Sequence, residues 1–521
     1  MQASRAGAWT TLGNLDSPAR AAVDPAGLVA IDGRTWSLDW WIGAEDRWHV
    51  PAREVAVRQS LVGGSPVVET RVRVPTGDAV HRVYAARDLD GVEALVVEVH
   101  NDTKVPFALA LAIRPYDLDG AGAIERIELD GSLVRVDGVS AVALSRSPGR
   151  FALSDADGDA AAVVFAGDAE PVRTADVRCH DGLANGAFLF PVAHTATVRV
   201  ALPLGRTAVE PDALPSANQV SSGWTAQSRA GARLEVPNRR VRDAIAASTR
   251  FLLLGGGDPT VAAALDLLGF ADEAAWRLKV DDEACSQGRT LAAIAQHWSL
   301  TGDLDAAIAA VPRIAALVPR RARPDEADDA SLGHAALPAL ADLLDAAGEP
   351  RAAADVRAVA HRSGAVAPAG PDLEALLATA SPTWTWSVAG RGHDLTANAA
   401  LVTAVRHLLA DEEPGGLVLS PGVPEAWIGQ GWEVHDLPTA EGRLGYAIRW
   451  HGDRPALLWD LEPRSGRPPA RLRVPRLDPA WSSTERRGEA LLAPSALPVR
   501  PSQRRGLTIP VTIEPTRRGP R

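Results

Sequence analysis

Three consecutive acidic residues in the middle of the chain are candidates for acid-base chemistry. Asp281, Asp282 and Glu283 are adjacent, and mutual repulsion between neighbouring carboxylates can raise the pKa of one of them enough to make it a proton donor. We therefore consider Glu283 and Asp282 candidate catalytic residues. A solvated loop between two helices accounts for the same cluster, because acidic side chains are mostly exposed.

A second group of polar and aromatic residues lies in the segment SPTWTWSVAGRGHDL. Indole rings stack on the apolar face of a pyranose and carry a hydrogen-bond donor, so Trp384 and Trp386 are candidate substrate-binding residues. Arg391 and His393 are placed to contact sugar hydroxyls, and Asp394 is a candidate second acid. Each has an alternative: core packing explains the indoles, and capping of a helix that starts directly afterwards explains Asp394.

The sequence contains no pattern that indicates a metal or a cofactor. Its histidines are scattered, and two cysteines, Cys179 and Cys285, are too few for a disulfide framework and lack the spacing of a zinc site. We expect two buried thiols, no metal and no cofactor.

Residues 1–235 are predicted to form an antiparallel β-sandwich. Apolar and polar residues alternate with a period of two in segment after segment, separated by Gly, Pro, Asp and Asn. In TWSLDWWI, the alternation sends Trp36, Leu38 and Trp40 to one face, as expected of a sandwich core.

The hydrophobic pattern then changes to the period of a helix, over residues 238–412. Apolar residues such as Leu291, Ile294 and Trp298 recur at helical spacing, and the pattern predicts about nine helical segments. Short connectors make neighbouring helices antiparallel hairpins. Trp276 and Trp298 lie on apolar stripes, so we expect both in the core.

The strand pattern returns at the end of the chain, in LVLSP, YAIRW and ALLWDL. Residues 415–521 are therefore predicted as a small C-terminal β segment. Its stretch from 464 to 505 is rich in Pro, Arg and Ser, which predicts a partly irregular tail.

Charge and hydropathy exclude two classes of partner. The net charge of −11 leaves no basic field for nucleic acid. The N-terminal segment lacks the continuous apolar run of a secretory signal, and no window reaches the ~18 apolar residues of a membrane span. We expect a cytoplasmic protein with neither a nucleic acid nor a membrane as partner.

Several segments resemble the six-hairpin glycosidases, the superfamily of glucoamylases and glycogen-debranching enzymes. VHNDTKVPFALALAIRPY resembles part of their N-terminal super-sandwich domain, AAALDLLGFADEAAWRL and EACSQGRTLAAIAQHWSLTGDLDAAI resemble consecutive hairpins, and LVLSPGVPEAWIGQGWEVHDLPTAEGRLGYAI resembles the segment that leads into the closing sheet. The resemblance implies an (α/α) toroid between the two β regions. That toroid is shortened here, because the predicted helices are fewer than six hairpins require.

The resemblance also implies a pair of catalytic carboxylates, which this sequence does not complete. Glycoside hydrolysis needs one carboxyl group to protonate the leaving oxygen and a second to activate water or attack carbon. The related enzymes open their second hairpin with acid-Trp-Asp; here Glu283 keeps the acid, but Ala284 and Cys285 replace the other two. Thr385 and Trp386 stand where relatives place a later acid.

Three functions remain open from the sequence. The altered motifs favour a catalytically degenerate scaffold that binds an oligo- or polysaccharide, or a carbohydrate-active enzyme. The second function is an active glycoside hydrolase that uses Glu283 as acid/base, and the third is an assembly protein that uses the toroid as an interaction surface. Because loops entering the inner helices of the resembled fold open on one rim, we expect Trp384, Trp386, Arg391 and His393 to meet Glu283 there.

Overall fold

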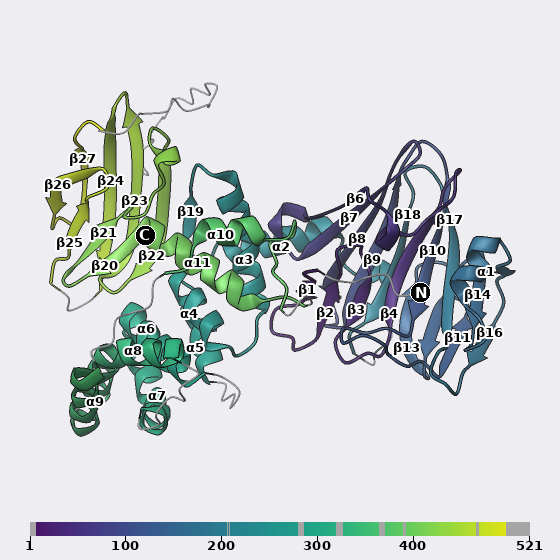
Figure 1. Cartoon of the computed structure of the whole chain (residues 1–521), viewed down its shortest axis with the longest axis horizontal. Helices are drawn as coiled ribbons and strands as arrows, with labels where there is room; N and C mark the ends of the chain where they lie inside the picture. The colour runs from purple at the N-terminus through teal and green to yellow at the C-terminus, as the bar shows by residue number, and fades with distance from the viewer. Residues whose placement is uncertain are drawn as a thin grey trace, which may run out of the picture.

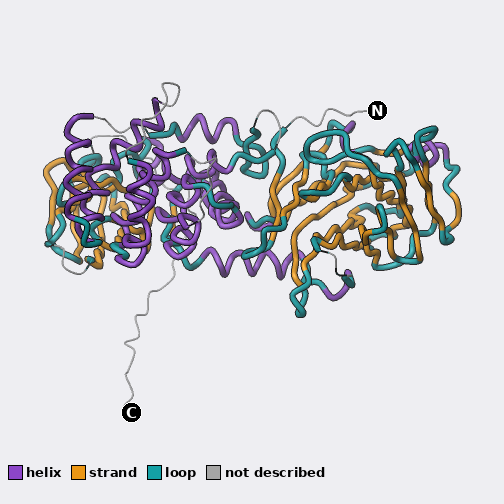
Figure 2. The backbone as a smooth tube through the Cα atoms, turned by 90° about the horizontal axis from the view of Figure 1, so that it is seen from below, coloured by secondary structure: helices purple, strands orange, loops and turns teal. Residues whose placement is uncertain are grey.

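The chain is elongated, with two β regions separated by helices (Figure 1). The structure is a computed structural model that describes residues 7–205, 207, 209–279, 286–318, 327–363, 370–388, 392–464 and 468–495. Seen from below, the N-terminal strands occupy one end of the molecule, and the helices lie beside the C-terminal strands at the other (Figure 2).

Two antiparallel nine-stranded sheets form the N-terminal sandwich. The first sheet has the order β1 (Thr10–Gly13), β2 (Arg20–Val23), β3 (Val29–Ile31), β4 (Ser37–Gly43), β10 (Phe107–Arg114), β17 (Asn185–Val192), β14 (Arg150–Ser154), β15 (Glu170–Pro171), with β5 (Trp48–His49) on β4. The second has the order β16 (Ala175–Arg178), β11 (Arg126–Asp130), β12 (Leu133–Val136), β13 (Val139–Leu144), β18 (Thr197–Pro203), β9 (Glu93–Asp102), β8 (Gly77–Arg87), β7 (Val67–Val74), β6 (Val57–Leu61).

The core between these sheets confirms the alternation seen in the sequence. Trp36, just before β4, and Leu38 and Trp40 of β4 all lie in it, and Trp40 is 1% exposed. Trp41 points to the opposite face, where helix α1 (Ala160–Ala166) covers it. Cys179 is a buried thiol in the same core, as expected.

Nine helices lie between Arg239 and Leu409 within the described residues, as many as the pattern predicts. They are α3 (Arg239–Leu254), α4 (Pro259–Leu267), α5 (Ala271–Lys279), α6 (Gln287–Thr301), α7 (Leu304–Leu317), α8 (Ala327–Ala346), α9 (Pro350–Ser363), α10 (Leu373–Thr379) and α11 (Leu395–Leu409). An earlier helix, α2 (Ala217–Ser228), lies between them and the sandwich (Figure 1). None of the described helices combines the length and apolar character needed to cross a bilayer.

Two smaller sheets end the fold and enclose a common core. One has the order β19 (Arg233–Glu235), β22 (Trp432–Thr439), β23 (Gly442–His451), β24 (Arg454–Pro463), β27 (Arg487–Leu491), and the other β20 (Ala410–Glu413), β21 (Gly416–Leu419), β25 (Arg471–Val474), β26 (Asp478–Ser483). Strand β19 lies within the range predicted as sandwich, yet it pairs with β22.

Strands β25, β26 and β27 lie within residues 464 to 505, the stretch predicted to form part of a partly irregular tail. Leu472 and Val474 are fully buried, and β25 pairs in parallel with β21. The apolar side chains alternate with arginines in RLRV, a period-two signal that the local abundance of Arg and Pro obscured.

Candidate functional site

The turn that carries Trp384 and Trp386 lies against the first strand of the sandwich. The hydroxyl oxygens of Thr383 and Thr10 are 2.8 Å apart across this junction. Trp386 is only 7% exposed, and its Nε1 donates to the carbonyl of Leu376 at 3.2 Å. The structure therefore places Trp386 in the core, where its ring faces contact protein.

Trp384 and His393 also belong to this junction. Trp384 is half-buried, with the guanidinium of Arg240 5.9 Å from its ring. His393 is half-buried, with Nδ1 3.1 Å from Thr11 Oγ1 and Nε2 2.8 Å from Asn398 Oδ1. Burial lowers the pKa of His393 to about 4, so the ring is neutral at pH 7. Both ring nitrogens are already occupied by protein partners.

Asp394 is the N-cap of α11. Its Oδ1 accepts from the backbone N–H groups of Thr396 at 2.9 Å and Ala397 at 3.3 Å, two groups that have no partner within the helix. This is the capping alternative considered from the sequence.

Removal of this cap is expected to destabilise the fold. Asp394→Ala should lower the free energy of unfolding by about 1 kcal/mol, since two helix N–H groups lose their acceptor. Asp394→Ser, which keeps a capping oxygen, should retain most of that stability. Urea unfolding measures both variants, and equal losses for Ala and Ser would contradict the capping role.

The remaining predicted residues, Asp282, Glu283 and Arg391, lie outside the described residues. The described residues on either side of the acid cluster include Lys279, at the end of α5, and Gln287, at the start of α6. Both side chains line a cavity of about 780 Å³ enclosed by α5, α6, α7 and α8.

The cavity combines one indole ring with polar groups on an aliphatic wall. Trp298 lines it and is partly buried, so it is not wholly a core residue as predicted. Ile294, Leu317 and Leu343 supply aliphatic surface. Trp276 corrects the prediction more strongly, because it is 60% exposed.

The polar groups of the cavity come from α5, α6 and α7. Asp303 caps α7 and accepts from Ala306 N at 3.0 Å, and Arg313 Nη1 donates to the carbonyl of Leu278 at 2.6 Å. Asp303 is the sole carboxylate among the described residues that line the cavity. These residues therefore offer hydrogen bonds but no pair of carboxylates across the space.

A buried Asp-His pair lies at the wall of the same cavity. His297 Nδ1 is 2.9 Å from Asp266 Oδ1, and the Asp266 side chain has no solvent exposure. Burial raises the pKa of Asp266, an effect that its hydrogen bond to His297 opposes. Sequence reasoning missed this pair because α4 and α6 bring the two residues together only on folding. The pair ties the two helices and holds the imidazole in place.

No family model matches the sequence, and no curated protein matches it. A solved structure of a bacterial glucoamylase complexed with acarbose matches with a TM-score of 0.51 at 9% identity, over 69% of this chain and 66% of that chain. The chain has a glucoamylase-like fold. A putative kojibiose phosphorylase from the human microbiome matches with a TM-score of 0.42 at 8% identity, over 93% of this chain and 92% of that one.

The glucoamylase-like fold confirms the architecture predicted from the sequence, an antiparallel sandwich followed by helices. It also confirms the resemblance to glycosidases at the level of the fold. The described residues contain no cluster of three or more His, Cys, Asp or Glu side chains able to hold a metal ion.

Proposed function

We propose that this chain binds an oligo- or polysaccharide in the cavity between α5 and α8 and does not hydrolyse it. The observation that carries the proposal is the lining: the Trp298 indole shares the cavity with Gln287 and Arg313. An indole packs on the C–H face of a sugar, and the polar side chains bind its hydroxyls. The volume of about 780 Å³ lies in the range of ligand sites, roughly 300–1,000 Å³.

The absence of hydrolysis is inferred from the carboxylates. Inverting and retaining glycosidases place two carboxyl groups roughly 5–9.5 Å apart across the scissile bond. Asp303 is the one carboxylate among the described lining residues, and its side chain is engaged as a helix cap. The altered motif around Glu283 supports the same conclusion.

Binding and turnover test this proposal in one set of proteins. We expect calorimetry to detect binding of maltohexaose or another neutral hexasaccharide, and turnover of α-glucans, nitrophenyl glycosides and trehalose to stay at background. Ala306→Trp fills the cavity and should weaken binding there by about tenfold or more, roughly 1.4 kcal/mol. Ala354→Trp makes the same change on the exposed face of α9 and should bind like the wild type.

Two results would contradict the proposal. Turnover that is abolished by Glu283→Gln would establish an active hydrolase with that residue as acid/base, the alternative that the sequence leaves open. Equal affinity in Ala306→Trp and Ala354→Trp would remove the cavity as the binding site.

Exposed apolar side chains on α5 and α7 favour a second candidate function, assembly with a carbohydrate-active enzyme. Leu304 and Ile308 on one face of α7 are 47% and 51% exposed, and Trp276 on α5 is 60% exposed. Leu304 and Ile308 are four residues apart on a helix, and neighbouring exposed apolar side chains are typical of protein interfaces. This function would use the outside of the helices and leave the cavity free.

A further inference from the structure

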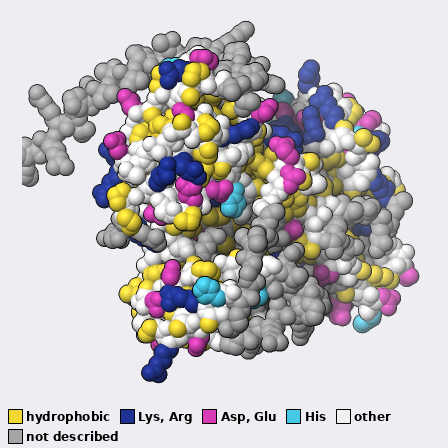
Figure 3. All heavy atoms as spheres, turned by 60° about the vertical axis from the view of Figure 1, so that its left-hand side comes forward, with side chains coloured by type: hydrophobic (Ala, Val, Ile, Leu, Met, Phe, Trp, Pro, Cys, Tyr) yellow, Lys and Arg dark blue, Asp and Glu magenta, His cyan; other side chains and the backbone are white. Residues whose placement is uncertain are grey.

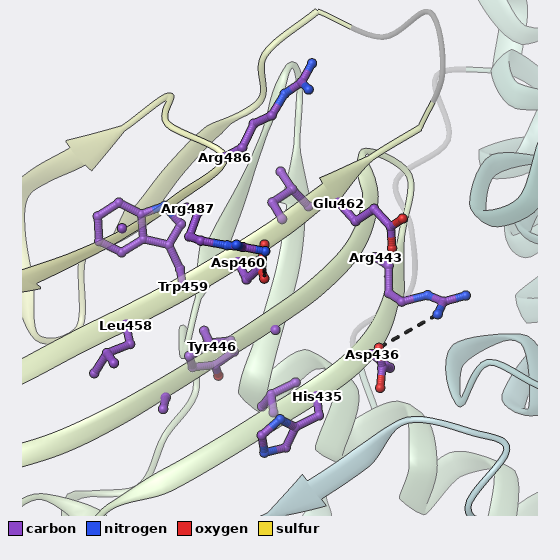
Figure 4. Close-up of a pocket in the computed structure, with 15 residues that line it drawn as sticks. His435, Asp436, Arg443, Tyr446, Leu458, Trp459, Asp460, Glu462, Arg486 and Arg487 are labelled. Carbon is purple, nitrogen blue, oxygen red and sulfur yellow. Dashed lines mark hydrogen bonds and ion pairs between the residues drawn. The ribbon is translucent and has the colours of Figure 1, made fainter. Parts of the chain in front are cut away.

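The outer face of the five-stranded C-terminal sheet carries a second hollow, of about 940 Å³. Strands β22, β23, β24 and β27 form it, and Figure 4 shows charged side chains standing around it. It is formed by a different region of the chain from the helical cavity and shares no lining residue with it.

The floor of this hollow includes Gly445, within β23, which has no side chain to fill the space above it. A Cβ built on Gly445 would meet only Val434 O at 3.7 Å and Asp460 O at 3.8 Å, which is ordinary contact. Gly445 is also absent from the glycines with positive φ. Neither packing nor backbone conformation therefore requires glycine here, although glycine weakens a strand interior and marks sites of close approach.

Gly488 on β27 differs from Gly445, because its surroundings leave no room for a side chain. A Cβ there would lie 2.5 Å from the Trp459 ring, so the fold itself requires that glycine. Gly445 instead leaves open space beside Ala447 and Leu458, two further floor residues. The result is a small apolar surface at the bottom of the hollow.

Charges around the hollow balance. Arg487 pairs with Asp460 at 2.6 Å, and Arg443 faces Asp436 at 3.8 Å (Figure 4). Glu462 and Arg486 complete three carboxylates and three guanidinium groups in the lining. Figure 3, which turns this end of the molecule forward, shows basic and acidic side chains interspersed rather than separated into patches of one sign.

We propose that this hollow is a second binding site and that its ligand is an uncharged oligosaccharide. A balanced set of carboxylates and guanidinium groups gives no net attraction to phosphate or to nucleic acid, but offers acceptors and donors to vicinal hydroxyls. Ala447 and Leu458 contact the C–H face of a sugar ring that approaches over Gly445. The site goes beyond the proposed function, since it does not depend on the helical cavity.

The test uses the full chain with the helical cavity closed by Ala306→Trp. The probes are maltohexaose, cellohexaose and laminarihexaose, with a heparin-derived hexasaccharide as the anionic comparison. In that background we expect residual binding of a neutral hexasaccharide, weakened about tenfold or more by Gly445→Val, whose side chain fills the floor. Gly445→Val should also raise the melting temperature, because valine favours a strand.

Ala456→Val is the matched control, because it adds a branched side chain to the same face of β24 outside the hollow. It should bind like the parent. Equal binding by Gly445→Val and the parent, stronger binding of the anionic hexasaccharide, or no binding of any neutral probe after Ala306→Trp would overturn the second site. The outcomes separate the two proposals. Loss of all binding in Ala306→Trp refutes only the hollow. Loss of all binding in Gly445→Val, made as a single change in the wild-type chain, refutes only the cavity.

Discussion

Acidification from pH 7 to pH 4 is expected to destabilise the wild-type chain by about 3 kcal/mol more than a His81→Leu variant. His81 is 1% exposed in β8 and stacks on Trp40, with ring centroids 4.6 Å apart and an interplanar angle of 13°. Its Nδ1 has no hydrogen-bond partner among the described residues. Burial lowers the pKa of His81 to about 3.

The direction of this effect follows from proton binding. In the unfolded chain a histidine takes up a proton near pH 6.5, whereas His81 in the fold remains neutral until about pH 3. The unfolded state therefore binds more protons between these values, and stability is full above pH 6.5 and falls as the pH drops toward 3. His393 acts in the same direction, from 6.5 toward about 4, but equally in both proteins, so the difference isolates His81.

Urea unfolding at the two pH values measures this difference. His451→Leu, at an exposed histidine, is the control and should keep the wild-type loss. An identical loss in the wild type and in His81→Leu would show that His81 is not held neutral by the fold.

The second large effect is expected from Trp432→Ala. Trp432 is 1% exposed, its Nε1 donates to Ser420 Oγ at 3.0 Å, and its ring lies 6.2 Å from that of Trp427. Truncation should lower the free energy of unfolding by about 3–5 kcal/mol, because it opens a cavity and leaves the Ser420 hydroxyl without its donor.

Trp276→Ala is the matched control for this prediction. The same truncation at a 60% exposed indole should change stability by no more than about 0.5 kcal/mol. Urea unfolding followed by circular dichroism compares the two variants. Similar losses would contradict the burial that the structure assigns to Trp432.

Periodicity predicted the elements well but not what covers them. The alternation in β4 placed Trp40 in the core, because both sheets of the sandwich supply a partner for their inner faces. The helical stripe of α5 could not show that Trp276 lacks such a partner. Nor could it show that Arg277 is buried, where its Nη2 donates to the carbonyl of Leu253 at 2.8 Å and so satisfies a group at the end of α3.

The candidate sites likewise divide into local features, which the sequence predicts, and contacts between distant segments, which it does not. Asp394 was predictable because capping is local to the start of one helix. The cavity contact between Asp266 and His297 arises from packing of two helices, and the opening above Gly445 depends on strands β22 to β27. Pairwise contacts between distant segments leave no local pattern in a single sequence.

Strand β19 has a consequence for the order in which the chain can assemble. Leu234 of β19 pairs with Val434 of β22. Because β19 is synthesised before α3 and β22 after α11, β19 cannot pair until the helices have been synthesised. During synthesis the sandwich can fold as it emerges, whereas the β19 edge stays open to foreign strands until translation has passed the helices. The helices are thus an insertion inside the last domain. Excising them at residues 238 and 412 would cut within β20, a strand of that domain's four-stranded sheet.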